Sequence, residues 1–315
     1  MRVHRIASVD YQSSTYPIYA LSLGSDSSDV PCLAFIAGIH GLERIGSEVV
    51  LAFLDTLIQR LEWDQSLISG LEQLRLLFIP VANPVGSLNS TRSNGNHVDL
   101  MRNAPLDAES RPAFLVGGHR LHPRIPWYRG PEGAPMEIES QAVCDFVRRE
   151  LLPAPFSILL DCHSGFGFDD RIWFPFAYSR RPIDHLSEVF ALKRLLNQTY
   201  PHLHYLFEPQ SLQYTTHGDL WDYLYLESLQ RDTVFLPLTL EMGSWRWVKK
   251  NPRQLASVSG LFNPIIPHRL RRVLRQHIVM MEFLIRACRA WQQWCPQPTQ
   301  RVFLQREALR HWYNT

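Results

Sequence analysis

Four short, almost wholly apolar runs, separated by helical patterns, are the feature of this sequence that most constrains its fold. The runs are PCLAFIAG, LRLLFIPVANP, FSILLDCHSG and TVFLPLTLEMGS, at residues 31–38, 74–84, 156–165 and 233–244. Each is typical of a buried strand that ends at a polar or glycine-rich turn. Residues 46–63 and 137–152 read as helices, the first with apolar residues along one face. This alternation predicts an α/β fold, a mixed, mostly parallel twisted β-sheet with helices on both faces.

The chain shows no repeat, low-complexity segment or linker that would divide it. With 315 residues, 45% of them hydrophobic, it is long and apolar enough to bury one large core. A long helix is expected over 268–295, ended by the prolines that follow. We therefore predict a single catalytic domain over 1–295 and a C-terminal tail over 296–315. Residues 111–135 are rich in Pro, Gly and Arg, which indicates a long surface loop of the kind that walls a cleft.

Charge and cysteine content narrow the function classes. Lys plus Arg number 32 and Asp plus Glu 30, so the net charge of +2 gives no reason to expect nucleic acid or an anionic membrane as a partner. No run approaches the roughly 20 apolar residues of a membrane helix. The five cysteines are widely spaced, with no C-x-x-C pair, as in reduced packing residues. We expect a cytoplasmic protein, and the sequence leaves its oligomeric state undetermined.

Metal-binding side chains follow three of the predicted strands. His40 and Glu43 follow the first strand, His163 ends the third and Glu241 ends the fourth. Ligands of open α/β sheets gather at the carboxyl ends of the strands. Two His and one Glu are a catalytic zinc set with a fourth position left for water. H-x-x-E is common without a metal, so the prediction of one zinc per chain depends on all three segments together.

Further polar residues accompany this set. Arg92 and Arg102 lie in a Gly- and Asn-rich segment directly after the second predicted strand. Structural arginines usually lie on the surface, whereas a guanidinium fork in such a loop suits a carboxylate ligand. Glu241 follows an almost wholly apolar run, and a carboxylate buried there needs either a charged or hydrogen-bonding partner or a functional role, because burying an unpaired charge is costly. Asp161, two residues before His163, either orients a histidine or simply ends the strand.

Seven ordered elements of the chain resemble the zinc metallocarboxypeptidases, also called funnelins. They are HGLE, NPVG, STRS, NHVDLMRN, YRGPEGAPMEIESQAV, LLDCHSG and LTLEMG. These elements stand in the family's order with similar separations and span residues 30–245, which makes them far more specific than any single motif. The resemblance implies the fold of a carboxypeptidase A-like catalytic domain.

The resemblance also implies an activity and roles for individual residues. The activity is removal of a carboxyl-terminal residue from a peptide or a peptide-like substrate, such as a cell-wall fragment. The zinc ligands would be the three residues named above, with Glu241 as general base and acid. Arg92 would polarise the scissile carbonyl, and Arg102 would hold the terminal carboxylate.

The chain departs from the family pattern at two points. Met101 stands where the family usually has Asn, so one hydrogen bond to the substrate carboxylate has no counterpart. The family's mobile tyrosine corresponds to Tyr214, although alignment on Gly218 places Gln213 there; the alternative for Tyr214 is an ordinary loop aromatic. The pocket for the substrate side chain is expected within 205–241, with Asp219 and Trp221 as candidates, and apolar, basic and diamino-acid side chains all stay open.

Two other functions stay open. GIHGLE and DLMR also resemble the acylase branch of this fold, which cleaves N-acyl amino acids such as succinylglutamate or acetylaspartate; its substrate would be an amino-acid-derived small molecule. A catalytically silent peptide-binding domain is the second alternative. Met101 favours it, whereas the complete set of three ligands and Glu241 argues against it.

Overall fold

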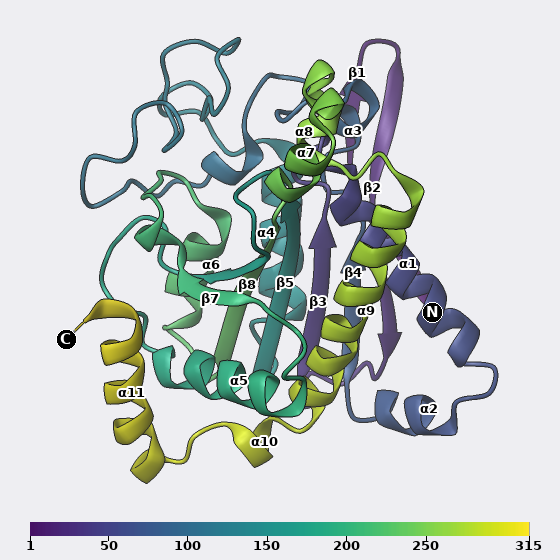
Figure 1. The fold of residues 1–315 in the computed structure, drawn as a ribbon, viewed down its shortest axis with the longest axis vertical. Coiled ribbons are helices and arrows are strands. Elements are labelled where there is room, and N and C mark those ends of the chain that lie inside the picture. Colours follow the sequence, from purple (N-terminus) through teal and green to yellow (C-terminus); the bar gives the residue numbers. More distant parts are fainter. Residues whose placement is uncertain (315) are drawn as a thin grey trace.

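An eight-stranded mixed sheet, in the order β1-β2-β4-β3-β5-β8-β6-β7, forms the centre of the computed structural model, which describes residues 1–314 (Figure 1). The strands are β1 (Arg2–Tyr11), β2 (Ser14–Gly24), β3 (Cys32–Ala37), β4 (Arg75–Ile79), β5 (Phe156–Ser164), β6 (Arg171–Phe174), β7 (Leu206–Pro209) and β8 (Val234–Met242). The central strands β4, β3, β5 and β8 are parallel, while β2 and β6 pair with them antiparallel. The predicted fold class is confirmed.

The four apolar runs of the sequence are the four central parallel strands. Every residue of β3 and of β5 is buried. Strands of a parallel sheet are covered on both faces, so their sequences are continuously apolar rather than alternating. This burial explains why these strands were predictable from the sequence.

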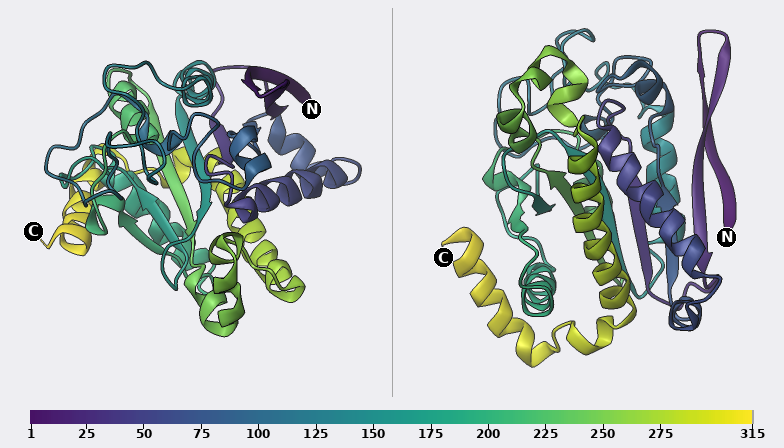
Figure 2. Two further views of the ribbon diagram at one scale, coloured as in Figure 1. Left: turned by 90° about the horizontal axis from the view of Figure 1, so that it is seen from above. Right: turned by 45° about the vertical axis from the view of Figure 1, so that its right-hand side comes forward.

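Helices cover both faces of the sheet (Figures 1 and 2). On one face α1 (Arg44–Arg60) and α9 (Pro267–Arg289) pack on β3 and β5. On the other face α6 (Leu220–Ser228) packs on β8, and α4 (Ile138–Glu150) packs on α6 and β1. The helices predicted over 46–63 and 137–152 are confirmed as α1 and α4. The remaining helices are α2 (Gln65–Leu71), α3 (Pro84–Asn89), α5 (Leu186–Thr199), α7 (Trp245–Lys250), α8 (Val258–Phe262), α10 (Trp291–Trp294) and α11 (Pro298–Tyr313).

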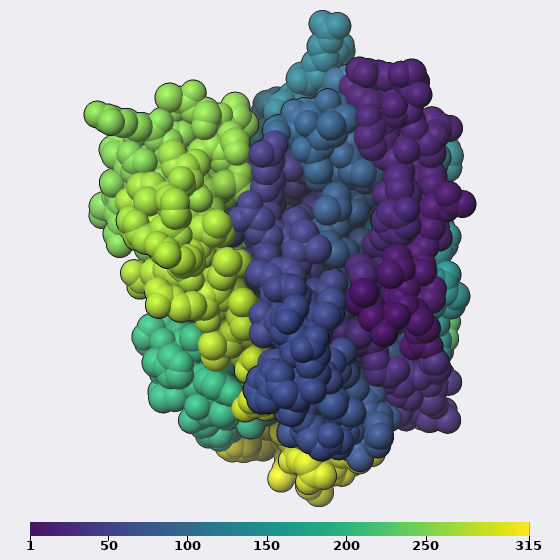
Figure 3. Space-filling view, turned by 90° about the vertical axis from the view of Figure 1, so that its right-hand side faces the viewer, coloured from purple at the N-terminus to yellow at the C-terminus, as the bar shows by residue number. Residues whose placement is uncertain are grey.

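The amino-terminal hairpin of β1 and β2 was not predicted. It stands along one edge of the molecule, where the right-hand view of Figure 2 and the purple atoms of Figure 3 show it. Only the last part of β2, Leu21–Gly24, pairs with β4. Because β1 has no fully buried residue, its sequence carries no apolar run that would mark it as a strand.

The carboxyl-terminal part differs in detail from the expectation. The helix expected over 268–295 is two helices, α9 and α10, separated at Ala290. The tail expected over 296–315 contains α11, which packs against α5. Trp312 of α11 is buried, and its indole Nε1 donates to the Phe207 carbonyl at 2.7 Å. Among residues 1–314, none of the helices combines the length and the apolar character needed to cross a lipid bilayer.

The long loop predicted over 111–135 is confirmed. Residues 104–135 contain no helix or strand, only an isolated bridge between His119 and Tyr128. The loop lies at the top of Figure 1, beyond the carboxyl ends of the central strands. It therefore lies on the side of the sheet where the predicted site residues emerge.

Candidate active site

His40, Glu43 and His163 converge at the carboxyl ends of β3 and β5. His40 Nδ1 lies 2.9 Å from Glu43 Oε1, and His163 Nδ1 lies 3.0 Å from Glu43 Oε2. The two Nδ1 atoms are 3.2 Å apart. Glycine is required in the turn that carries His40, because a Cβ on Gly41 would lie 1.9 Å from the carbonyl carbon of Gly86. The sequence-predicted ligand set is thus brought together from two separate segments.

The geometry of these three side chains fits a zinc ion. Ligand atoms from all three lie within 4.8 Å of one another and are buried. Zn–N bonds of about 2.0–2.1 Å in a tetrahedral site place two ligand atoms roughly 3.3 Å apart, close to the spacing of the two Nδ1 atoms. Two imidazole lone pairs and a carboxylate that point to one place repel one another unless a cation lies between them.

The other ring nitrogen of each histidine faces a buried carboxylate. His40 Nε2 lies 3.1 Å from Asp99 Oδ1, and His163 Nε2 lies 2.6 Å from Asp161 Oδ2. Each carboxylate holds the ring proton on Nε2, so that Nδ1 is free to bind a metal. Asp161 therefore orients His163 rather than only ending the strand. Its Oδ2 also accepts a hydrogen bond from Trp221 Nε1 at 2.9 Å.

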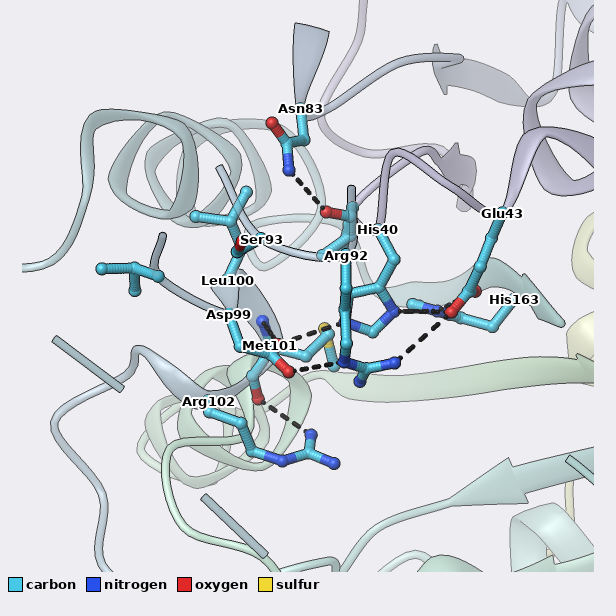
Figure 4. A network of polar contacts seen from close by, with 12 residues as sticks. His40, Glu43, Asn83, Arg92, Ser93, Asp99, Leu100, Met101, Arg102 and His163 are labelled. Carbon is cyan, nitrogen blue, oxygen red and sulfur yellow. Dashed lines mark hydrogen bonds and ion pairs between the residues drawn. The ribbon is translucent and has the colours of Figure 1, made fainter. Parts of the chain in front are cut away.

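Asp99 is the site residue that the sequence reasoning missed. Besides His40, it accepts hydrogen bonds from Arg92 Nε at 2.8 Å and from the Met101 backbone N–H at 3.1 Å (Figure 4). Burial favours the neutral acid, but Arg92 and His40 hold the pKa of Asp99 well below its usual range. The sequence did contain one indication of this role, because Asp99 lies in the element NHVDLMRN, which also contains Arg102. Asp99 connects His40, a candidate metal ligand, to Arg92.

Within His40, Glu43 and His163, here called the triad, neighbouring charges shift the pKa values of Glu43 and His163. Burial opposes ionisation of Glu43, yet the neighbouring His40 and His163 lower its pKa below the ordinary value. Burial likewise disfavours the charged form of His163, but Asp161 and Glu43 raise its pKa well above the ordinary value. A metal ion that binds here would therefore compete with protons for the ligand atoms.

All seven predicted site residues line one cavity of about 610 Å³. The triad forms part of its wall, together with Arg92, Arg102, Tyr214 and Glu241. The loop over 104–135 contributes Ala113, Val116, Pro126 and Trp127, which confirms its expected place at the cleft. A larger hollow, of about 910 Å³, lies beside α5, β7 and α11 and contains none of the predicted residues.

Glu241 lies beside the triad. It pairs in register with His163 on the adjacent strand, and its Oε1 accepts a hydrogen bond from the Phe166 backbone N–H at 3.0 Å. Burial and the nearby Glu43 carboxylate raise the pKa of Glu241 to about 8, and a bound cation would lower it again. A carboxylate in this range is suited to accept and return a proton near neutral pH.

Arg102 brings a buried positive charge to the same cavity. It is 3% exposed, and its guanidinium donates to the carbonyls of Val116 and Met101, each at 3.3 Å. No carboxylate of residues 1–314 lies within the 4.0 Å of an ion pair. The charge is thus balanced by no direct anionic partner, and a carboxylate in the cavity would supply one. The Met101 side chain lines the cavity beside it.

Comparison with known proteins agrees with this geometry. A sequence model of the family described as zinc carboxypeptidase matches residues 11–244. The chain belongs to the zinc carboxypeptidase family.

Individual proteins that resemble the chain more distantly are also carboxypeptidases or share their fold. Carboxypeptidase SOL1 of Arabidopsis thaliana is 24% identical over 107 residues, which are 33% of this chain and only 22% of that protein. The structure of thrombin-activatable fibrinolysis inhibitor superposes with a TM-score of 0.66 at 19% identity, covering 91% of this chain and 69% of that one. Carboxypeptidase A from Helicoverpa armigera gives 0.66 at 18% identity, covering 92% and 68%. At such identities, the structural likeness establishes the fold.

The two candidates for the family's tyrosine, Tyr214 and Gln213, lie in different places. Tyr214 lines the cavity and packs edge-on against Trp173, with ring centroids 6.1 Å apart. Burial raises the pKa of Tyr214, and Arg102 opposes this rise. Gln213 instead donates to Glu208 at 3.0 Å and does not line the cavity. Of the two residues, only Tyr214 reaches the cavity.

The two candidates for the side-chain pocket have different positions. Asp219 lines the cavity, and its Oδ1 caps α6 by accepting from the backbone N–H of Trp221 at 2.9 Å and of Asp222 at 3.0 Å. Trp221 is not among the lining residues, because its indole is turned to Asp161 beneath the triad. Of the two, only Asp219 reaches the cavity.

Proposed function

We propose that this zinc carboxypeptidase family member is an active metallocarboxypeptidase that hydrolyses the carboxyl-terminal amide bond of a peptide or peptide-like substrate. One observation carries the proposal: a zinc-type triad, Glu241 and Arg102 line the same cavity. The triad suits a hydrolytic metal, and the unpaired guanidinium suits the free carboxylate that marks a chain end.

His40 and His163, through Nδ1, and Glu43, through its carboxylate, would hold the zinc ion. When bound, zinc lowers the pKa of a coordinated water and polarises the scissile carbonyl. Glu241 takes a proton from the attacking water and passes it to the nitrogen of the departing residue. Arg92 is anchored by Asp99 through Nε and lies 3.5 Å from Glu43 Oε1 through Nη1, so Nη2 would serve the carbonyl oxygen as negative charge develops there.

Arg102 would bind the terminal carboxylate of the substrate. Because Met101 offers no side-chain hydrogen bond, the carboxylate depends more heavily on Arg102 and on Tyr214 than it would with an Asn beside it. The aromatic side chains of Phe166, Trp127 and Trp173 line the same cavity and supply apolar contact for the rest of the substrate.

Glu241→Gln tests this mechanism, because it keeps the shape and removes the proton acceptor. We expect release of the carboxyl-terminal residue from short peptides to fall by roughly 10²–10⁴-fold, while zinc content per chain stays unchanged. The first is measured by amino-acid release and the second by elemental analysis. Full activity in a zinc-loaded Glu241→Gln protein would show the mechanism to be wrong.

The same assay separates the alternatives. Short peptides are compared with N-acyl amino acids such as succinylglutamate and acetylaspartate. The family match and the element GPEGAPMEIESQAV favour peptides. Turnover of N-acyl amino acids alone would identify a deacylase, and zinc binding without turnover of either class would identify a silent binding domain.

A further inference from the structure

One segment next to the active site has an extreme charge composition. Residues 243–281 contain no Asp or Glu, although the whole chain has 32 Lys plus Arg and 30 Asp plus Glu. The basic residues in the segment are Arg246, Lys249, Lys250, Arg253, Arg269, Arg271, Arg272 and Arg275. The segment forms α7, the short 3-10 helix Pro252–Ala256, α8 and the first half of α9. In Figure 3 it projects as the light-green lobe at the upper left.

Four of these cations surround a hollow of about 140 Å³ between α7 and α9, here called the α7/α9 hollow. Its basic wall residues are Arg246 and Lys250 from α7 and Arg269 and Arg272 from α9. Asp170, His268, Gln276 and His277 are the other polar residues of its wall. Side chains from two facing helices thus bring positive charge to one concave place.

Most of these cations have no anionic partner. Arg246 pairs with Asp169 at 2.8 Å, but Arg269 donates only to the Trp247 carbonyl at 3.0 Å and to Gln254 Oε1 at 3.3 Å. Within residues 1–314, neither Lys250 nor Arg272 has a carboxylate within the 4.0 Å of an ion pair. By contrast, Arg148 of α4 meets both oxygens of Glu227 of α6 at 2.7 Å.

The charge balance of the hollow indicates the valence of its ligand. One carboxylate, Asp170, lies in the wall, but its two oxygens accept from the Gly243 backbone N–H at 2.9 Å and from Gln276 Nε2 at 2.7 Å. With Asp169 beside Arg246, four cations face two carboxylates, so two positive charges are in excess. Like charges held together in a concave place are unfavourable unless an anion joins them.

We propose that the α7/α9 hollow binds a small, doubly charged anion, a phosphate group or a dicarboxylate. The two guanidinium groups of α9 offer planar forks that match either anion, and Lys250 adds a mobile point charge from the opposite wall. This site is separate from the active-site cavity, since the two have no lining residue in common.

Anion binding at the hollow would restrain the loops that carry the zinc-type triad. Trp245 Nε1 donates to the Gly165 carbonyl at 2.9 Å, in the turn directly after β5. Asn263 Nδ2 donates to the Leu42 carbonyl at 2.8 Å and Asn263 Oδ1 accepts from the Ile45 backbone N–H at 2.9 Å, in the other ligand-bearing loop. The segment over 245–263 therefore holds both loops. An anion that ties α7 to α9 restrains this segment, and by reciprocity a ligand in the active-site cavity would strengthen anion binding.

Titration of the full, zinc-loaded chain with inorganic phosphate and with succinate, by calorimetry at constant ionic strength in chloride, tests the proposal. The double variant Lys250→Gln/Arg272→Gln should weaken binding about tenfold or more, because it removes two charge-assisted contacts. Lys249→Gln/Arg275→Gln is the matched control: it removes the same charge from α7 and α9 at positions outside the hollow, and should change the affinity less than about twofold.

The outcomes are distinct. Loss of binding in the first variant alone supports the site, and the anion that binds, phosphate, succinate or both, identifies its class. Equal binding by all three proteins would place the anion elsewhere, for example on the metal, and would overturn the proposal, as would the absence of saturable binding. Slower amide hydrogen exchange over 245–263 with phosphate is expected; unchanged exchange would overturn the link to the triad. None of these readouts depends on peptidase activity.

Discussion

The triad and the α7/α9 hollow both adjoin the segment over 245–263, but they differ in how their charged groups are paired. At the triad, both ring nitrogens of each histidine and both oxygens of Glu43 face a polar partner. In the hollow, Lys250 and Arg272 have no carboxylate partner within residues 1–314. The triad gathers lone pairs that a cation would hold together, whereas the hollow gathers positive charges that an anion from outside would hold together. Arg102 in the active-site cavity follows the second pattern, in keeping with a substrate carboxylate.

The largest expected effect is loss of metal from the triad. His163→Ala removes one of three ligands, so we expect zinc to fall from about one per chain to near zero. Elemental analysis of protein purified without chelator measures this. His202→Ala, an exposed histidine outside the triad, is the control and should keep its zinc. Stoichiometric zinc in His163→Ala would mean that the three residues are not the metal site.

A smaller effect is expected at Asp99, which supports the triad without belonging to it. Asp99→Asn removes the charge that faces both His40 and Arg92, so zinc affinity should fall about 10–100-fold. Stability should fall by about 1–3 kcal/mol, because Arg92 loses its buried partner. Competition with a zinc chelator and urea unfolding measure the two effects.

Asp107→Asn provides the control for Asp99→Asn. Asp107 also pairs with an arginine, Arg129, at 2.7 Å, but its side chain is 76% exposed. We expect zinc affinity to be unchanged and stability to change little. Equal losses of zinc affinity in the two variants would contradict the positioning role of Asp99.

Burial decides which parts of the fold and of the site could be predicted from the sequence. The four central strands were predictable because burial on both faces makes them continuously apolar. The triad, Glu241 and Asp161 could be located because each stands at or just beyond the end of such a strand. The hairpin β1 and β2 carries no such signal, because half-exposed strands need no apolar run.

Contacts between distant segments were beyond sequence reasoning. The partnership of Asp99 with His40 joins positions 59 residues apart, and that of Trp221 with Asp161 joins positions 60 apart. The excess of basic residues over 243–281 can be counted in the sequence, but their convergence depends on how α7 packs beside α9. Side-chain direction explains the difference between Asp219 and Trp221 as well, since the N-cap of α6 faces the cavity and the second residue of the helix faces Asp161.

Trp221 leads to a prediction of intermediate size. Trp221→Phe keeps most of the buried volume and removes the N–H that reaches Asp161, so stability should fall by about 1 kcal/mol. Zinc affinity should weaken less than in Asp99→Asn, because Asp161 keeps its direct contact with His163. Trp294→Phe is the matched control: its indole Nε1 donates to the Ala287 carbonyl at 2.8 Å, away from the triad. If both variants weakened zinc equally, the path from Trp221 to His163 would be disproved.

The smallest expected effect is the sharpest test of the comparison. Arg272→Gln removes a charge that has no carboxylate partner among the described residues, so the free energy of unfolding in chloride should stay within about 0.5 kcal/mol of the parent, or rise as repulsion in the hollow is relieved. Arg148→Gln, which breaks the two-point contact with Glu227, should instead cost about 0.5–1 kcal/mol. Urea unfolding measures both. Phosphate should then stabilise the parent and Arg148→Gln more than Arg272→Gln, because only a bound anion makes Arg272 part of a pair. A clear loss of stability in Arg272→Gln without phosphate would show that this arginine already has a partner in the folded chain.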